Sequence, residues 1–412
     1  MGFYRFDSPY DWNRVTPYKE TAKNAAGGMI DLSVGSPVDP VPASVQQALA
    51  DSADAPNAHG YPTVAGTEDL RKAVQEWFSA KRGVDFGAIG ADFVPTVGSK
   101  EAVALMASLL HFGPGDVIVQ PEVSYPTYDI GTQLAGAKTY KAADIADVDS
   151  WRRVPGVKAV WVNSPSNPTG EVLSASQLHG IVAAAREIGA VVLSDECYGL
   201  LTWADNSDGN DASNGANVEA GNGQSAKRSN DGLPENVGKT AVIEPSPAPC
   251  MLQPDVCDGS AKDILVLYSL SKQSNMAGYR TALIAGDPEL VRPMTVYRKQ
   301  IGEIIPGPVQ AAMAAGLRDS DAVSAQHARY SKRLRELVDG LRAYGYDAYM
   351  PQGALYVWVR AKSNDCWQDM ADLARLGIIA SPGEFYGAPT YLRFSATATD
   401  ASIAEVVSRL RG

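Results

Sequence analysis

The sequence predicts an α/β fold in which a mostly parallel sheet lies between layers of helices. Short runs of Val, Ile and Leu alternate with helical segments through the middle of the chain. Strands that are buried on both faces are continuously apolar, whereas strands with one face exposed to solvent alternate apolar and polar residues. Polar segments follow four of these apolar runs directly, and ligands of open α/β sheets bind at the carboxyl ends of the strands.

The first well-defined helix is expected to begin after Gly66. Thr67 can cap its amino end, and the acidic pair Glu68 and Asp69 suits the positive end of the helix dipole. Gly83 is expected to end it. Apolar residues recur at helical spacing and form one buried stripe, which consists of Leu70, Ala73, Val74, Trp77 and Phe78.

Strands and helices then alternate. Further helices are expected at 99–110 and 178–188, the second closed by Gly189. Pro95 weakens the first expected strand, because proline cannot donate to a sheet ladder. The expected strands are residues 93–97, 117–119, 157–162, 190–193, 264–267 and 281–285.

The chain is expected to divide into an arm and two domains. Residues 1–44 are predicted to be an irregular arm that joins the small domain, residues 45–290 the large domain, and residues 291–412 a small α+β domain. Residues 204–240 lack large apolar side chains and are interpreted as a disordered surface insertion. Within the small domain the pattern predicts helices at 325–342 and 402–410, a helix ending at 373–377, and strands at 346–350 and 354–359.

Composition excludes several classes of function. A formal net charge of −11 argues against nucleic acid or an anionic membrane surface as the main partner. The four cysteines form no C-x-x-C pair and only four histidines are present, so we expect no metal site. No apolar run is long enough to cross a bilayer and the amino terminus does not resemble a signal peptide, so a cytoplasmic enzyme is expected.

Lys272 directly follows the buried strand at 264–267, in the segment Tyr268–Lys272. Burial would desolvate its ammonium and lower its pKa, and a partly neutral lysine can form a Schiff base with an aldehyde. Ser269, Ser271 and Arg280 could hold a phosphate nearby. Together these residues suggest pyridoxal 5′-phosphate (PLP) chemistry. The alternative is a strand-end lysine whose ammonium reaches solvent.

Three more polar segments lie where strands end. Gly98–Glu101 opens a helix whose backbone N–H groups could bind phosphate, although the same pattern is an ordinary cap. Asn163–Gly170 fixes Asn167 between two prolines, or forms a common Asn-Pro turn. Asp195 lies in the segment Ser194–Tyr198 and needs a cationic partner if it is buried. A protonated pyridine nitrogen would be such a partner. The alternative is that Asp195 caps a helix.

In this order, the segments resemble the class I and II aminotransferases of PLP fold type I, and within them most closely the actinobacterial type of succinyldiaminopimelate aminotransferase. The resemblance covers essentially the whole chain except 204–240, and implies a mostly parallel seven-stranded sheet in a large domain beside a smaller one. It rests on Asp31–Pro42, Gly98–Glu101, Ser124–Asp129, Ser164–Gly170, Ser194–Tyr198, Ser269–Arg280 and Tyr391–Ser395.

The resemblance implies a role for each matched residue. Lys272 would bind the PLP aldehyde and move the proton, and Asp195 would pair with the pyridine N–H. Asn167 and Tyr198 would donate to the ring 3′-oxygen, and Tyr125 would stack on the ring. The phosphate would be gripped by Ser99, the backbone of Lys100, Ser269, Ser271 and Arg280.

Three further roles follow from the same resemblance. Arg393 would clamp the substrate α-carboxylate, with Asn167 also on the substrate side, and Gly35 would close over that carboxylate. Tyr61 would reach the phosphate of a neighbouring subunit, which implies a homodimer with shared sites. Tyr297, Arg298 and Lys299 are candidates for the distal end of the substrate, or equally form a solvated helix face.

The implied activity is transfer of an amino group between glutamate/2-oxoglutarate and a keto acid, with N-succinyl-2-amino-6-oxopimelate of lysine and diaminopimelate biosynthesis as the expected acceptor. The alternatives are an aminotransferase of other amino acids or a cystathionine-type C–S lyase, which would use the same lysine, aspartate and arginine. A PLP-fold regulator is disfavoured by the acidic charge and the retained site lysine. The insertion and Gln273, which stands where a basic residue is expected, depart from the family pattern.

Overall fold

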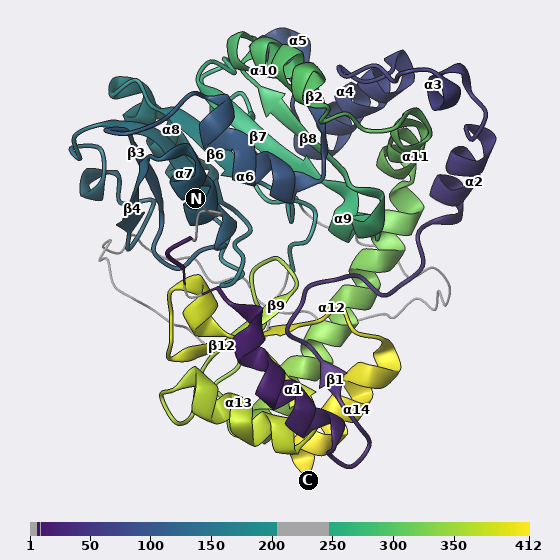
Figure 1. Ribbon diagram of the computed structural model, residues 1–412, viewed down its shortest axis with the longest axis vertical. Coiled ribbons are helices and arrows are strands. Elements are labelled where there is room, and N and C mark those ends of the chain that lie inside the picture. The colour runs from purple at the N-terminus through teal and green to yellow at the C-terminus, as the bar shows by residue number, and fades with distance from the viewer. Residues whose placement is uncertain (1–5, 9, 204–246) are drawn as a thin grey trace, which may run out of the picture.

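The computed structural model describes residues 6–8, 10–203 and 247–412. The insertion expected at 204–240 lies outside the described residues. The described chain forms two lobes, one around a seven-stranded sheet and one around a three-stranded sheet (Figure 1). Within these residues no helix is long and apolar enough to cross a bilayer.

The seven-stranded sheet has the strand order β2-β8-β7-β6-β5-β3-β4, and only β8 runs against its neighbours. The mostly parallel sheet expected from the sequence is therefore confirmed. The edge position of β2 explains how Pro95 is tolerated, since a proline there costs no central ladder bond. The strands are β2 Asp92–Val97, β3 Val117–Pro121, β4 Lys138–Ala142, β5 Val157–Asn163, β6 Val191–Asp195, β7 Ile264–Ser269 and β8 Thr281–Gly286.

Helices cover both faces of this sheet, which is why its strands are apolar throughout. In β7, Ile264 and Val266 pack with one cluster of helices, and Leu265 and Leu267 pack with the other. The helices of this lobe are α2 Ala43–Asp51, α3 Pro56–His59, α4 Glu68–Arg82, α5 Phe86–Ile89, α6 Ser99–Leu109, α7 Thr127–Ala135, α8 Ala175–Glu187, α9 Leu270–Gln273, α10 Pro288–Ile301 and α11 Gly307–Arg318.

Helix α4 forms as its sequence predicts. The Thr67 side chain accepts from the backbone N–H of Leu70, and Gly83 ends the helix in the left-handed conformation. The five residues of the expected stripe are all buried. Capping and burial together therefore determine where α4 begins, ends and faces.

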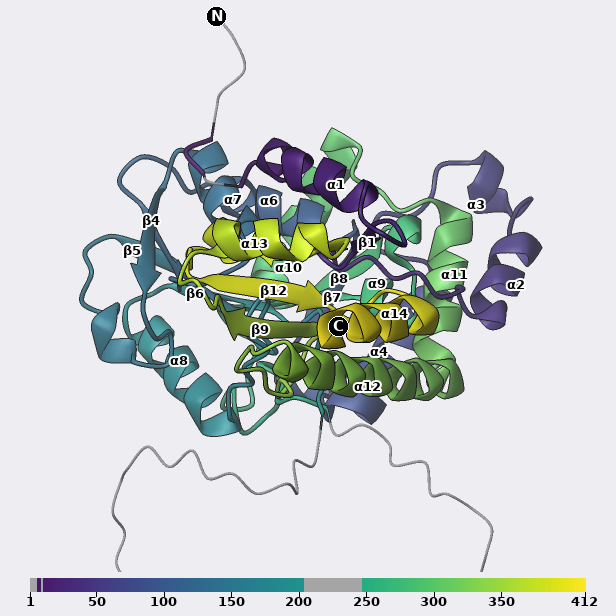
Figure 2. The same ribbon diagram turned by 90° about the horizontal axis from the view of Figure 1, so that it is seen from below.

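In the second lobe, β9 and β12 lie between helices, with α13 on one side and α12 and α14 on the other (Figure 2). Strand order is β11-β12-β9, all antiparallel. The elements are α12 Ser320–Ala343, β9 Tyr356–Arg360, α13 Cys366–Arg375, β10 Ile378–Ile379, β11 Ser381–Pro382, β12 Tyr391–Ser395 and α14 Asp400–Arg411.

The strand expected at 346–350 is wrong. Tyr346 and Ala348 are buried, but no strand of the described chain pairs with them. The N–H of Tyr346 instead donates to the carbonyl of Leu341, and the Arg342 side chain donates to the carbonyl of Ala348. An alternating pattern marks which side chains are buried, and here the backbone groups find their partners at the end of α12.

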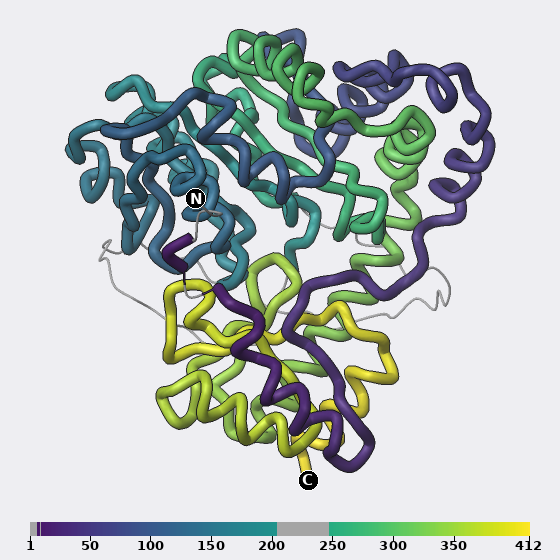
Figure 3. The backbone as a smooth tube through the Cα atoms, viewed as in Figure 1, coloured from purple at the N-terminus to yellow at the C-terminus, as the bar shows by residue number. Residues whose placement is uncertain are grey.

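The amino-terminal arm is more regular than expected. It contains α1 Thr16–Lys23, which packs on α13, and β1 Ile30–Asp31, which pairs in parallel with β10. Proline near the amino end of α1 suits the first turn of a helix. The chain then runs from the second lobe back to the first through residues 32–42 (Figure 3). This segment brings Gly35 between the two lobes.

Contacts bear on where the large lobe ends. Helix α10 packs on β2, and α11 packs on α2 and α4, so both belong spatially with the seven-stranded sheet. Helix α12 runs from that lobe into the other (Figure 1). Instead of the boundary expected near residue 290, we propose one near Asp319, at the start of α12.

A buried ion pair links α4 to the segment after β6. Arg82 Nη2 lies 2.5 Å from Glu196 Oε2, and both side chains are almost fully buried. Glu196 also accepts from Ser194 and from the N–H of Met251. Removing one charge would leave the other buried without a partner.

We therefore expect Glu196→Gln to lower the free energy of unfolding by about 3–5 kcal/mol in urea titrations. The matched control is Glu76→Gln, because Glu76 pairs with Lys72 on the surface of α4, the helix that also carries Arg82. That change should cost less than about 1 kcal/mol. Equal losses in the two variants would contradict a structural role specific to the buried pair.

Candidate active site

A cavity of about 360 Å³ lies at the carboxyl ends of β5, β6 and β7, between the two lobes. It gathers residues from both lobes and from the arm. Of the thirteen residues expected to contact the cofactor or the substrate α-carboxylate, twelve line the cavity: Gly35, Ser99, Lys100, Tyr125, Asn167, Asp195, Tyr198, Ser269, Ser271, Lys272, Arg280 and Arg393. Tyr61 does not line it and is fully exposed.

Lys272 lies on α9, immediately after β7, as the sequence suggested. Burial lowers the pKa of its amine, against the opposing influence of Tyr356 and Cys197. The amine contacts the carbonyl oxygen of Gly35. This lysine is therefore a desolvated nucleophile inside the cavity and not a surface charge.

Asp195 ends β6, next to β7 in the sheet, where it is paired in register with Leu267. Its carboxylate accepts from the Tyr128 hydroxyl at 2.8 Å and from the N–H of Cys197 at 3.2 Å. Burial raises its pKa. Within the part of the chain that the structure describes, no lysine or arginine forms an ion pair with it, so its cavity side can receive a cationic group.

The other end of the cavity has the features of an anion site. Ser99 and Lys100, the first two residues of α6, line this end, and the free N–H groups of a helix amino terminus favour an anion. The Arg280 guanidinium lies against Gly98, where a Cβ atom would stand 2.2 Å from Arg280 Nη2. Ser269 and Ser271 share a hydrogen bond of 2.8 Å beside it. Arg280 forms no ion pair with a carboxylate of the described residues, which leaves its charge for a ligand.

Arg298, a candidate for the distal end of the substrate, has a different role. It is fully buried on α10, and both its terminal nitrogens donate to the carboxylate of Glu101 at 2.9 and 2.8 Å. Arg298 and its neighbours Tyr297 and Lys299 are absent from the cavity lining. The guanidinium instead holds the first turn of α6 against α10, so distal recognition by Arg298 is wrong.

Arg393 enters the cavity from β12 of the second lobe. It donates to the side-chain oxygen of Asn167 and to the carbonyl of Ser33, both at 2.7 Å. The rings of Tyr356 and Tyr386 lie 4.0 and 4.8 Å from its guanidinium carbon. These contacts join the first lobe, the arm and the second lobe at one cation.

Several functional positions were missed by sequence reasoning. Asn163 accepts from the N–H of Asn167 and donates to the carbonyl of Asp195, so it fixes two site residues at once. Its place at the end of β5 was a usable signal. Tyr10, Trp12 and Tyr386 form an aromatic part of the lining. Nothing local in the sequence marks these three, because they reach the cavity only through tertiary packing.

These residues fit PLP. A buried carboxylate that pairs with no lysine or arginine of the described residues suits a pyridinium nitrogen, and a buried amine of lowered pKa suits the aldehyde. The glycine at 98 leaves room for Arg280 at a helix amino terminus, as a phosphate requires. Tyr198 and Asn167 lie beside these groups in the same lining.

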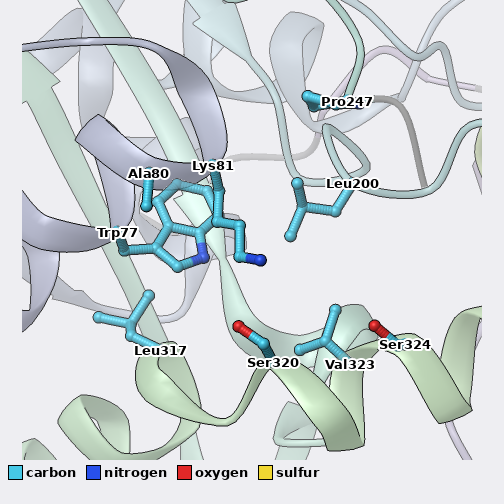
Figure 4. Close-up of a pocket in the computed structure, with 9 residues that line it drawn as sticks. All are labelled: Trp77, Ala80, Lys81, Leu200, Pro247, Leu317, Ser320, Val323 and Ser324. Atoms are coloured by element: carbon cyan, nitrogen blue, oxygen red, sulfur yellow. The ribbon is translucent and has the colours of Figure 1, made fainter. Parts of the chain in front are cut away.

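A second hollow, of about 90 Å³, is not a candidate for this chemistry. It lies between α4 and the amino end of α12. Its lining includes the indole of Trp77, the Lys81 amine and the hydroxyls of Ser320 and Ser324 (Figure 4). Among the described residues, the rest of its lining is apolar or small, with neither a carboxylate nor a second cation.

We expect Gly98→Ala to weaken PLP binding to the apoenzyme by at least about tenfold, since the new methyl group would displace Arg280. The control is Gly90→Ala, because Gly90 has a similarly positive φ of 67° but open space at Cβ. Fluorescence titration with PLP measures both. Equal affinities in the two variants would mean that Arg280 does not hold the phosphate.

Comparisons with known proteins agree with this geometry. The family model described as aminotransferase class I and II matches residues 27–410. The 4-dedimethylamino-4-oxo-anhydrotetracycline transaminase of Streptomyces rimosus is 36% identical over 97% of this chain and 98% of its own length. A probable aminotransferase of Mycobacterium tuberculosis is also 36% identical, over 97% of this chain and 84% of its own.

Among solved structures, a probable N-succinyldiaminopimelate aminotransferase from Thermus thermophilus superposes with a TM-score of 0.77 at 22% identity, covering 97% of this chain and 99% of that one. This likeness shows the fold type I architecture expected from the sequence. The family match extends over both lobes and includes every cavity residue from Val34 to Arg393. The chain therefore belongs to the class I and II aminotransferases, which are PLP-dependent enzymes.

Proposed function

We propose that this aminotransferase moves an amino group between glutamate/2-oxoglutarate and N-succinyl-2-amino-6-oxopimelate, with Lys272 as the residue that binds the cofactor aldehyde and moves the proton. The observation that carries the reaction type is the placement of Asp195 at the end of β6 and of Lys272 just after the neighbouring strand β7, with Arg393 facing them across one cavity. The acceptor rests on the sequence resemblance and agrees with the printed name of the Thermus neighbour.

PLP, when bound, supplies a ring that withdraws electrons from the substrate α-carbon. Different residues of the protein would then bind the cofactor, transfer the proton and hold the substrate carboxylate. Asp195 would pair with the protonated pyridine nitrogen, and the Lys272 amine would accept and later donate the proton of the substrate α-carbon. Arg393 grips the α-carboxylate with Asn167 beside it, and Gly35 closes over that carboxylate. Ping-pong kinetics with two half-reactions should result.

The cofactor contacts follow the same assignment. Ser99, the backbone of Lys100, Ser269, Ser271 and Arg280 would hold the phosphate. Tyr125 would stack on the ring, and Tyr198 would donate to its 3′-oxygen with Asn167. The hydroxyl of Tyr198 is buried in the cavity lining, where it can reach a bound ring.

We further propose a homodimer in which Tyr61 completes the phosphate site of its partner. Tyr61 is a large aromatic side chain with full exposure. A second copy would give it a binding partner. We also propose a cytoplasmic location, in agreement with four buried cysteines that form no disulfide.

A second candidate substrate has its own support. The lining contains Tyr10, Trp12 and Tyr386, which would pack well on a ring, and the Streptomyces relative is named for a polycyclic ketone. An aminotransferase for a ring-bearing keto compound is therefore the alternative within the same reaction type. A cystathionine-type lyase would use the same cofactor residues but needs no amino acceptor.

A panel of acceptors with glutamate as donor separates these candidates. It should include the succinylated, acetylated and free diaminopimelate precursors, an aromatic keto acid, and cystathionine without an acceptor. We expect the highest kcat/KM with the succinylated precursor. Highest kcat/KM with the aromatic keto acid would favour the alternative. Pyruvate and ammonia from cystathionine alone, with no transfer, would contradict transamination.

We expect Arg393→Lys to raise the KM for glutamate about 10- to 100-fold, because an ammonium cannot reproduce the bidentate guanidinium–carboxylate contact. The affinity of the apoenzyme for PLP should stay within about twofold, since Arg393 lies away from the phosphate end. Steady-state kinetics and PLP titration measure these quantities. An unchanged KM would remove Arg393 from carboxylate binding.

We expect Lys272 of the apoenzyme to titrate below the ordinary lysine pKa of 10.5, since burial lowers its pKa. Only the neutral amine acylates, so its labelling by acetic anhydride should reach half-maximum at a lower pH than that of Lys332. Glu336 beside Lys332 raises the pKa of that exposed lysine. Peptide mass spectrometry across a pH series gives both midpoints, and the reverse order would contradict a desolvated Lys272.

A further inference from the structure

Tyr356, which no sequence pattern singled out, contacts three groups of the site. It is buried at the start of β9, opposite Ser395 of β12. Its hydroxyl oxygen lies 2.8 Å from that of Tyr198, and the Arg393 guanidinium carbon lies 4.0 Å from the centre of its ring. One side chain of the second lobe therefore contacts both Tyr198 and Arg393.

The arm also approaches this tyrosine closely. A Cβ atom at position 35 would stand 2.2 Å from the Tyr356 hydroxyl oxygen, so only glycine allows the arm to pass here. The carbonyl of Gly35 in turn contacts the Lys272 amine. The Tyr356 hydroxyl thus lies between the arm at Gly35 and the hydroxyl of Tyr198.

The proton count of the two hydroxyls decides what this contact can do. Each tyrosine hydroxyl has one hydrogen to donate, and the Tyr198–Tyr356 bond can form in either direction. If Tyr198 donates to Tyr356, its hydrogen is not available to the cofactor. If Tyr356 donates, Tyr198 accepts that bond and keeps its own hydrogen for the 3′-oxygen of PLP.

We propose that Tyr356 is a positioning residue that donates its hydroxyl proton to Tyr198 and thereby directs the Tyr198 proton toward the cofactor. This inference rests on the proposed function, in which Tyr198 donates to the 3′-oxygen. A chain of two hydroxyl bonds strengthens each member, because a hydroxyl that accepts a bond becomes a better donor. Tyr356 would thereby favour the deprotonated state of the PLP that is linked to Lys272.

The ring and the hydroxyl of Tyr356 serve different neighbours, which allows a clean test. Tyr356→Phe keeps the ring under Arg393 and removes only the bond to Tyr198. The primary measurement is the pH midpoint of the absorbance change of the bound cofactor. We expect this midpoint to rise, with about a threefold increase in proton affinity, as one neutral hydrogen bond is lost. The KM for glutamate should stay within about twofold.

The opposite direction of the bond gives the opposite result. If Tyr198 donates to Tyr356 in the native enzyme, Tyr356→Phe releases the Tyr198 hydrogen to the cofactor and the midpoint falls. A lowered or unchanged midpoint therefore overturns the proposal. In a Tyr198→Phe background, adding Tyr356→Phe should change the midpoint no further, and an additional shift of equal size would also contradict it.

Tyr346→Phe is the matched control for folding. Tyr346 is another buried tyrosine of the second lobe, and its hydroxyl donates to Asp369 at 2.9 Å without lining the cavity. Its loss should leave the absorbance midpoint unchanged. If wild-type enzyme shows no PLP linked to Lys272, the proposed function and this inference both fail. If the link is present and the expected rise is absent, only the role of Tyr356 fails.

Discussion

Desolvation of charged groups at the carboxyl edge of the sheet is the constraint on which this site depends. Strands β6 and β7 are buried on both faces, so Asp195, which ends β6, and Lys272, which follows β7, are removed from water. Burial moves both groups toward their neutral forms, raising the pKa of Asp195 and lowering that of Lys272. The helices that cover the parallel sheet therefore also lower the pKa of the lysine nucleophile, because they exclude water from it.

Such a site needs both lobes to be held in register. Arg393 reaches from β12 to Asn167 of the first lobe and to the arm at Ser33. Farther along the arm, the carboxylate of Asp39 accepts hydrogen bonds from both terminal nitrogens of Arg333 on α12, at 2.7 and 2.8 Å. Gln326 of the same helix donates to Asp39 and accepts from Asn275, three residues beyond Lys272. These bonds connect the arm, the bridging helix and the lysine loop in one network.

Local signals in the sequence predicted the elements and side chains that act where they stand. The cap and stripe of α4, the apolar strands, and the polar residues directly after β6 and β7 could be located because the covalent chain fixes their neighbours. The end of β5 likewise led to Asn167. Strand β4 was missed, since Lys138–Ala142 carries few apolar side chains.

Other features depend on contacts between distant segments, which no single sequence pattern records. Arg298 had the charge expected of a substrate ligand, but its partner is Glu101 on another helix. The alternating residues at 346–350 are buried without a partner strand. Tyr356 owes its place to the pairing of β9 with β12, and β1 owes its existence to β10. In each case tertiary packing decides a role that residue type leaves open.

The central claim is that the amine of Lys272 is the covalent anchor of PLP. Reduction of the PLP-loaded enzyme with borohydride, followed by peptide mapping, tests it directly. We expect a single stable pyridoxyl adduct on the peptide that contains Lys272, and no such adduct in a Lys272→Ala variant. An adduct on a different lysine, or no adduct in enzyme that holds PLP, would contradict it.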